Sequence, residues 1–148
     1  MPHLVFSGRL DLSAASLDPK VHRWGRAVLK TDACWLRADE AAMLVEGVVV
    51  EFSRPLHPVA VAAHHRGETT LRLWKTVAVE RTRPVQRWLC LVALELQRCG
   101  AGPVRVTNIP SELWRDLELQ VVPELRSDPR IEFGCRCRVP AHVFDSMC

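Results

Sequence analysis

Residues 82–100 read TRPVQRWLCLVALELQRCG, and this stretch determines what the rest of the chain must build. Thr82 is a favourable N-cap residue, and Pro84 lies in the first turn, where its missing N–H would lack a partner in any helix. Apolar residues recur at spacings of three and four and predict one buried stripe: Val85, Trp88, Leu89, Val92 and Leu96. Because Gly100 suits the C′ position, the pattern predicts a helix over 84–99 that covers a partner surface.

The chain before this helix carries strand signals. Apolar and β-branched runs, bounded by turn residues, predict strands over 3–12, 27–36, 43–52, 59–65 and 69–79. Pro55 and Pro58 predict a loop before the fourth of these strands, because proline cannot donate to a strand ladder. Arg66-Gly67 has the length of a two-residue hairpin turn. A helix over 39–45 is the competing interpretation of the region where the third strand starts.

The chain after Gly100 alternates between strand and helix signals. Residues 103–107 predict a short buried strand, and Ser111 caps a second predicted helix. Pro123 would end or kink that helix, because proline removes a backbone donor and clashes with the preceding turn. In residues 131–139 apolar and polar side chains alternate strictly, which predicts a half-buried strand.

These elements together predict an α+β fold: a mixed, mainly antiparallel β-meander sheet with two helices packed on one face. Strands dominate residues 1–80, and helices alternate with strands over 81–148. We find no internal repeat, low-complexity tract or long Pro/Gly/Ser linker in the sequence. We therefore expect residues 1–148 to form a single domain, which is long enough to bury its own core.

The composition is that of an ordinary globular protein, with 48% hydrophobic residues, 25% charged residues and a formal net charge of +3. Such a small positive surplus does not by itself establish a nucleic-acid partner. No window approaches the roughly 18 uninterrupted apolar residues of a membrane span. Charged residues occupy the place where a signal peptide needs an apolar stretch: Arg9, Asp11, Asp18 and Lys20. We expect a soluble, cytoplasmic protein with reduced cysteines and no membrane partner.

The sharpest candidate metal site lies at the C-terminus. Its ligands follow the pattern C-x-C-x4-H-x5-C and are Cys135, Cys137, His142 and Cys148. Three thiolates and one imidazole would close a tetrahedral zinc site. The competing interpretation is that the cysteines of the 131–139 strand are buried and pack as small apolar side chains. We expect no cofactor on that interpretation, and zinc on the first.

Exposed groups on the predicted sheet are the favoured binding site. Trp74 is flanked by Arg72 and Lys75 on a strand, and tryptophan and arginine are enriched at the centres of protein interfaces. His64 and His65 are neighbours on a strand and therefore point to opposite faces, so at most one faces inward, where Glu68 would orient it. We expect a non-catalytic protein-binding or regulatory module, with a second copy of the chain as another possible partner. Single-stranded nucleic acid, stacked on Trp74, is a third interpretation.

The N-terminal sequence supplies an enzymatic alternative. Met1 followed by Pro2 and an apolar strand resembles the opening of the tautomerase superfamily, notably the 5-carboxymethyl-2-hydroxymuconate isomerases. The resemblance implies that Pro2, freed of Met1, is the proton shuttle, that Arg9 or Arg37 holds the substrate carboxylate, and that a helix follows the first strand. The sequence contains no G-x-S-x-G, G-x-x-x-x-G-K-[ST], H-E-x-x-H or G-x-G-x-x-G motif, which lowers the expectation of common hydrolase or nucleotide chemistry.

Overall fold

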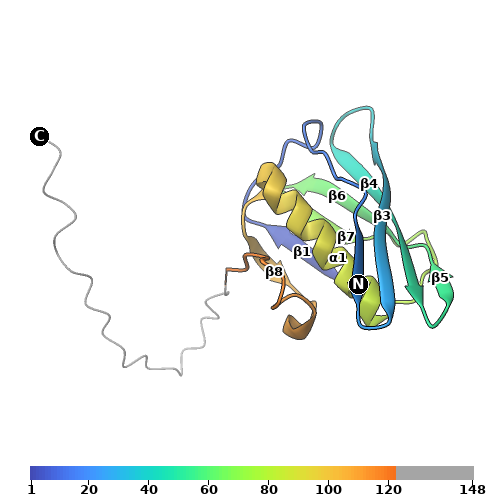
Figure 1. The fold of residues 1–148 in the computed structure, drawn as a ribbon. Helices are drawn as coiled ribbons and strands as arrows, with labels where there is room; N and C mark the ends of the chain where they lie inside the picture. The colour runs from blue at the N-terminus through green and yellow to red at the C-terminus, as the bar shows by residue number, and fades with distance from the viewer. Residues whose placement is uncertain (123–148) are drawn as a thin grey trace, which may run out of the picture.

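The computed structural model describes residues 1–122 (Figure 1). Its strands are β1 (His3–Phe6), β2 (Val21–Trp24), β3 (Ala27–Leu36), β4 (Ala42–Glu51), β5 (Arg54–Leu56), β6 (Val59–His65), β7 (Glu68–Leu73) and β8 (Val104–Thr107). The helix α1 (Arg83–Leu96) continues into a π-helical turn, η1 (Gln97–Ala101), and a single 3-10 turn, η2 (Ser111–Leu113), follows β8.

The strands form one antiparallel sheet that curls into a half-barrel around α1 (Figure 1). Their order is β2-β3-β4-β6-β7-β1-β8, with β5 paired to β4 beyond the end of β6. Strands β2 to β7 are therefore linked by short connections, whereas β1 and β8 come from distant parts of the chain. The helix contacts β3, β4 and β7, so it lies on the inner side of the curl.

The helix prediction is confirmed in its N-cap and its buried stripe, whereas the helical run extends beyond the predicted 84–99, to Ala101. The hydroxyl of Thr82 accepts a hydrogen bond from the backbone N–H of Val85, as an N-cap residue does. All five residues of the predicted stripe are buried. Gly100 has a φ of 103°, a left-handed conformation that glycine adopts without steric cost.

The expected fold of two helices on a mixed sheet is wrong. The described chain has one helix of 19 residues, Arg83–Ala101, and a mostly antiparallel sheet. The segment after Ser111 forms only the short turn η2. Its end runs extended beside β8, where Val121 pairs with Val104. There the side chain of Gln97 donates to the carbonyl of Gln120 at 2.8 Å and accepts from its N–H at 3.0 Å. A local pattern cannot show such a clamp between distant residues.

Several strand boundaries also differ from the predicted ones. The first predicted strand ends early, at Phe6, and the fifth ends at Leu73. The structure adds two short strands that the sequence patterns did not indicate, β2 and β5. Strand β5 contains Pro55 and pairs only with β4, an edge position that tolerates the missing donor. The predicted strand over 131–139 lies outside the described residues.

The core fills the space between the inner face of the sheet and α1. Side chains at alternate positions of β4 point inward and are buried, including Val45 and Val49. Trp88 is fully buried and its indole donates to the hydroxyl of Thr31 at 3.3 Å. A Cβ atom on Gly47 would lie 2.4 Å from the Trp88 ring. Only glycine therefore lets the helix approach the sheet this closely.

A buried arginine ties α1 to the chain after β8. Arg87 is 7% exposed, and its guanidinium donates to the carbonyl of Leu113 at 2.9 Å. It also makes a two-point hydrogen bond to the carboxylate of Asp116, one branch of which is 3.0 Å long. The pKa of Asp116 is lowered, first by this hydrogen bond from Arg87. The pair fixes the segment around η2 against the helix.

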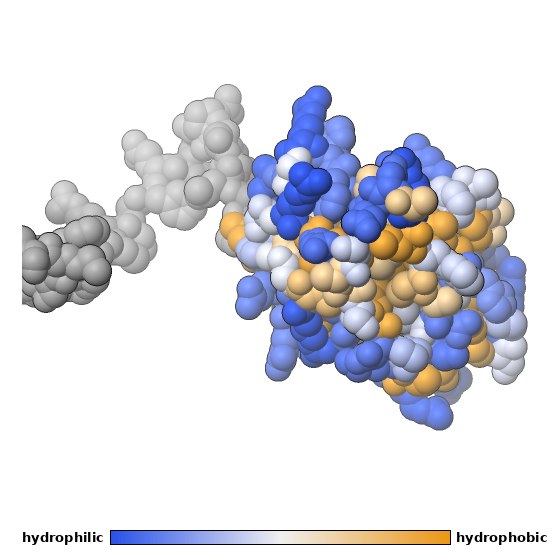
Figure 2. All heavy atoms as spheres, turned by 90° about the horizontal axis from the view of Figure 1, so that it is seen from above, coloured by the Kyte–Doolittle hydropathy of each residue, from blue (hydrophilic) through white to orange (hydrophobic). Residues whose placement is uncertain are grey.

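No α-helix of residues 1–122 packs on the outer face of the sheet. Large apolar side chains stay exposed at several places on the molecule: Val21, Trp35, Leu36, Phe52, Trp74 and Val122. Viewed from above, apolar groups gather in the middle of the surface and charged groups surround them (Figure 2). Within the described residues, no helix has the length and apolar character needed to cross a membrane.

Candidate functional site

The outer face of the sheet carries a straight row of side chains across five strands. The strand register places Trp35 opposite Leu44, Leu44 opposite Val61, and Val61 opposite Arg72. His3 lies opposite Arg72 and completes the row on β1. Directly opposed residues in an antiparallel sheet share one face, so these five side chains are neighbours in space. The row runs from an aromatic end to a basic end.

Two tryptophans border an apolar groove of about 400 Å³ at the first end of this row. Trp35 is 59% exposed and Trp74 is 38% exposed. Between them, Leu44 and Val61 form the floor of the groove, and Arg37 lies at its edge. Partly exposed aromatic rings beside an apolar floor suit the insertion of a bulky side chain from a partner. We call this groove, with Trp35, Leu44, Val61 and Trp74, the tryptophan groove.

A second, more polar hollow of about 350 Å³ continues the same face beyond Arg72. It is lined by His3, His65 and Arg72, with Thr70 between them. Neither this hollow nor the tryptophan groove is lined by an aspartate or a glutamate. Arg72 is exposed and makes no ion pair with any of residues 1–122. The face therefore presents positive charge next to apolar surface.

Two carboxylates near this face have partners of their own, whereas Glu46, two positions after Leu44 on the outward side of β4, makes no ion pair with another described residue. Glu68 accepts from Arg105 at 2.7 Å. Asp39 is paired with Arg37, and this hydrogen bond is the largest cause of the lowered pKa of the Asp39 carboxyl and the raised pKa of the Arg37 guanidinium. The charge of Arg37 is thereby largely compensated. Arg72 is the cation on this face that is left to bind a ligand.

His64 and His65 point to opposite sides, as neighbours on a strand must. His65 is exposed on the outer face, whereas His64 is half-buried and its Nδ1 is buried without a hydrogen-bond partner in the described chain. The pKa of His64 is lowered by burial first and by Arg9 second, with Asp11 acting in the opposite direction. His64 therefore stays neutral near pH 7 and contributes no charge to the binding face.

The structure does not bring together the residues that the tautomerase resemblance implies. Pro2 is buried, and its carbonyl accepts a backbone hydrogen bond from Leu73 at 3.5 Å. Arg9 lines a hollow beside His64, whereas Arg37 lies at the tryptophan groove. The chain passes from β1 through a loop into β2, so the helix implied after the first strand is not there. Pro2 lines neither the hollow that contains Arg9 nor the groove that contains Arg37.

The predicted zinc ligands Cys135, Cys137, His142 and Cys148 lie outside the described residues. Over residues 1–122, no three histidine, cysteine or acidic side chains are grouped closely enough to hold a metal ion. Cys34, Cys90 and Cys99 are free thiols. Burial raises the pKa of Cys90 to about 12, with a small opposing effect of Arg87, so this thiol is protonated and unreactive at neutral pH.

Trp35 is one of the site residues that sequence reasoning missed, together with Leu44 and Val61. Simple alternation along β3 would place Lys30 and Trp35 on opposite faces. A bulge between Thr31 and Ala33 shifts the register by one residue and turns Trp35 to the same outer face as Lys30. Asp32, a poor strand former in the middle of a long strand, is the one sequence signal for this irregularity.

Comparison with known proteins gives no relative from which a role can be transferred. No protein-family model matches the chain, and neither a curated protein nor a solved structure is significantly similar to it.

Proposed function

We propose that this chain is a non-catalytic binding module that recognises an extended segment of another protein through the outer face of its sheet. The observation that carries the proposal is the row from Trp35 to Arg72, in which an apolar groove lies next to a cation without an acidic partner in residues 1–122. Tryptophan and arginine side chains of this kind dominate the binding energy of many interfaces.

The chemistry of the face defines the partner segment. A bulky apolar side chain would enter the tryptophan groove over Leu44 and Val61, and a carboxylate would approach Arg72 from the polar hollow. An arginine binds a carboxylate through two parallel hydrogen bonds, which adds geometric selectivity to the charge attraction. Neither hollow is lined by an acidic residue, and β6 separates Glu46 on β4 from Arg72 on β7, so a carboxylate at Arg72 meets little repulsion.

Strand spacing sets the distance between the two contacts. The middle of the groove floor, between β4 and β6, lies about one and a half strand spacings from β7, which is roughly 7 Å. Two residues of an extended chain span about the same length. The bound segment should therefore carry its acidic residue two positions away from its bulky apolar residue.

A displayed library of random 12-residue peptides tests the proposal. The library is selected on the full chain and counter-selected on a variant that combines Trp35→Ala and Trp74→Ala. We expect enriched peptides to share a bulky apolar residue and an acidic residue at the stated spacing. For a synthetic peptide of this kind, Trp35→Ala and Arg72→Gln should each weaken binding at least tenfold, whereas Val21→Ala and Arg23→Gln, which alter exposed residues of β2, should change it less than twofold.

Three results would overturn the proposal. The first is the absence of any sequence enriched over the double variant. The second is tight, strongly salt-dependent binding of a 15-residue oligothymidylate that the same variants abolish, which would make the face a nucleic-acid site. The third is sedimentation of the chain as a dimer that Trp35→Ala dissociates, because a second copy would then cover the face.

A further inference from the structure

The polar hollow of about 350 Å³ beyond Arg72 brings together nitrogen-bearing side chains from three strands. Arg72 on β7 lies opposite His3 on β1, and the next outward position of β7 is Thr70. His65 on β6 lies on the other side of Thr70, where it faces Glu68 across the strand pair. Arg72, His3 and His65 all line the one hollow, so they surround any group that is bound over Thr70.

These side chains keep nitrogen atoms available for a ligand. Arg72 and His65 are exposed, and Arg72 makes no ion pair with any of residues 1–122. The Nδ1 atom of His3 lies 3.1 Å from the carbonyl oxygen of Met1, which leaves Nε2 of the same ring for the hollow. The hydroxyl of Thr70 already donates to a backbone carbonyl at 3.2 Å, so the floor of the hollow supplies no competing donor.

The charges beside the hollow are also mainly positive. Glu68 is the carboxylate at the start of β7, and it is paired with Arg105 at 2.7 Å. Arg66 is exposed in the turn between β6 and β7 and makes no ion pair with another described residue. His64 also lines the hollow, but it stays neutral near pH 7 because burial lowers its pKa. An anion therefore meets uncompensated cations here and no carboxylate in the lining.

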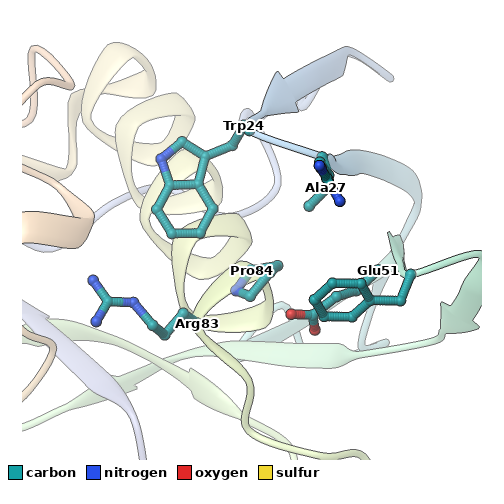
Figure 3. Close-up of a pocket in the computed structure, with 8 residues that line it drawn as sticks. Trp24, Ala27, Glu51, Arg83 and Pro84 are labelled. Atoms are coloured by element: carbon teal, nitrogen blue, oxygen red, sulfur yellow. The ribbon is translucent and has the colours of Figure 1, made fainter.

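A second pocket of similar volume, about 390 Å³, shows by contrast what an unselective lining looks like (Figure 3). Its aromatic and charged lining residues come from two hairpin turns and the start of α1 and are Trp24, Phe52, Arg26, Arg83 and Glu51. Arg83 is paired with Glu112 at 3.5 Å. Arg26 and Glu51 remain without an ion-pair partner in residues 1–122, so their charges balance. The polar hollow lacks such a balancing carboxylate beside Arg72.

A phosphoryl group on a side chain matches the polar hollow better than a carboxylate does. It carries about 1.5 to 2 negative charges near pH 7 and three strong acceptor oxygens, whereas a carboxylate has one charge and two oxygens. A guanidinium binds two of the three oxygens through parallel hydrogen bonds, and the third remains for an imidazole N–H. A dianion also favours the protonated form of an adjacent imidazole, in which both ring nitrogens donate.

We propose that the polar hollow binds a phosphorylated serine or threonine of the partner segment, and that phosphorylation there raises the affinity of the segment for this chain. The inference rests on the function proposed above, because the phosphoryl group occupies the acidic position of that segment, two residues from the bulky apolar side chain in the tryptophan groove. The groove then supplies binding that is independent of phosphorylation, and the hollow makes the interaction respond to it.

Three synthetic peptides of one selected sequence test the proposal by calorimetry on the full chain; they differ at the acidic position only, which is serine, glutamate or phosphoserine. We expect the phosphoserine peptide to bind at least tenfold more tightly than the glutamate peptide, and the serine peptide to bind most weakly. Arg72→Gln should reduce the advantage of phosphoserine over glutamate to less than threefold. His65→Phe keeps a flat ring without an N–H and should reduce this advantage at least twofold.

Two control variants separate the hollow from general effects. Arg26→Gln removes the same charge as Arg72→Gln, but from the balanced pocket, and should leave all three affinities within twofold. Trp35→Ala should weaken the three peptides by the same factor, because the tryptophan groove does not contact the variable position. Loss of the phosphoserine advantage in Arg26→Gln would overturn the assignment to the hollow.

Inorganic phosphate and acetate, added without peptide at equal pH and ionic strength, make the two possible failures distinguishable. Phosphate should shift the imidazole NMR signals of His3 and His65 at concentrations at least tenfold lower than acetate, and Arg72→Gln should remove this difference. Equal effects of the two anions, or a glutamate peptide that binds as tightly as the phosphoserine peptide, would overturn this inference and leave the proposed function standing. Selective phosphate shifts without binding of any peptide would instead overturn the proposed function, and with it the phosphorylated segment.

Discussion

On its inner face the sheet packs against α1, whereas its outer face meets no α-helix within residues 1–122. Both faces are built by the same alternation along the same strands, and both are rich in apolar residues. Inward positions such as Val45 are fully buried, while outward neighbours such as Leu44 remain half-buried. The difference shows that an apolar pattern identifies a strand without telling which of its faces the fold will cover.

The largest contrast between the faces should come from two tryptophans. Trp88 is fully buried against the inner face, so Trp88→Ala should lower the free energy of unfolding by about 3–5 kcal/mol. Trp35 is 59% exposed on the outer face, so Trp35→Ala should change it by about 1 kcal/mol or less. Denaturant unfolding of the full chain measures both values. If Trp88→Ala does not fold, Trp88→Phe replaces it in the comparison. Trp88→Phe should still lower the free energy of unfolding more than Trp35→Ala does.

Substitutions that enlarge a side chain should also destabilise the fold more on the inner face than on the outer face, by smaller amounts. Gly47→Ala places a methyl group against the Trp88 ring and should destabilise the fold by about 1–3 kcal/mol. Ala33→Val enlarges a half-buried residue of β3 that lies on the outer face two positions before Trp35, and it should alter the free energy of unfolding by about 0.5 kcal/mol or less. Combining Gly47→Ala with Trp88→Phe should recover part of the loss, because the two substitutions share one contact. Additive losses would contradict this packing.

The pH dependence of the free energy of unfolding tests the ion pair between Arg87 and Asp116, which holds the segment around η2 against α1. The folded-state pKa of Asp116 is lowered, so the pair contributes stability that is present above the unfolded value near 4 and is lost as pH falls through the folded pKa. Asp116→Asn should therefore be less stable than the parent chain at pH 7, and the difference should shrink toward pH 3. Urea unfolding at several pH values measures this, and a constant difference would contradict the assignment.

Local patterns predicted the parts of the fold that depend on neighbours in sequence. The spans 27–36 and 59–65 match β3 and β6, and the N-cap at Thr82 is present, because alternation and capping act over a few residues. The second helix failed because the clamp of Gln97 on Gln120 acts between elements distant in sequence. Trp35 was missed for a related reason, since a one-residue bulge reverses the face that parity assigns.

The candidate site could be anticipated only in part. Arg72 and Trp74 were selected because they are polar and aromatic residues on a predicted strand, and the structure places both on the outer face, Trp74 at 38% exposure. Their partners Leu44 and Val61 come from other strands, and only the register identifies them. The pocket around Trp24 and Phe52 depends on β2 and β5, two short strands whose existence no periodic pattern indicated.

The most direct measurement is the unfolding free energy of the full chain carrying both Trp35→Ala and Trp74→Ala. If the outer face is open and serves binding, the double variant should lose at most about 1 kcal/mol and keep the m-value of the parent, while its peptide affinity falls at least tenfold. A loss above about 3 kcal/mol would contradict the account, because it would mean that both indoles belong to a covered core.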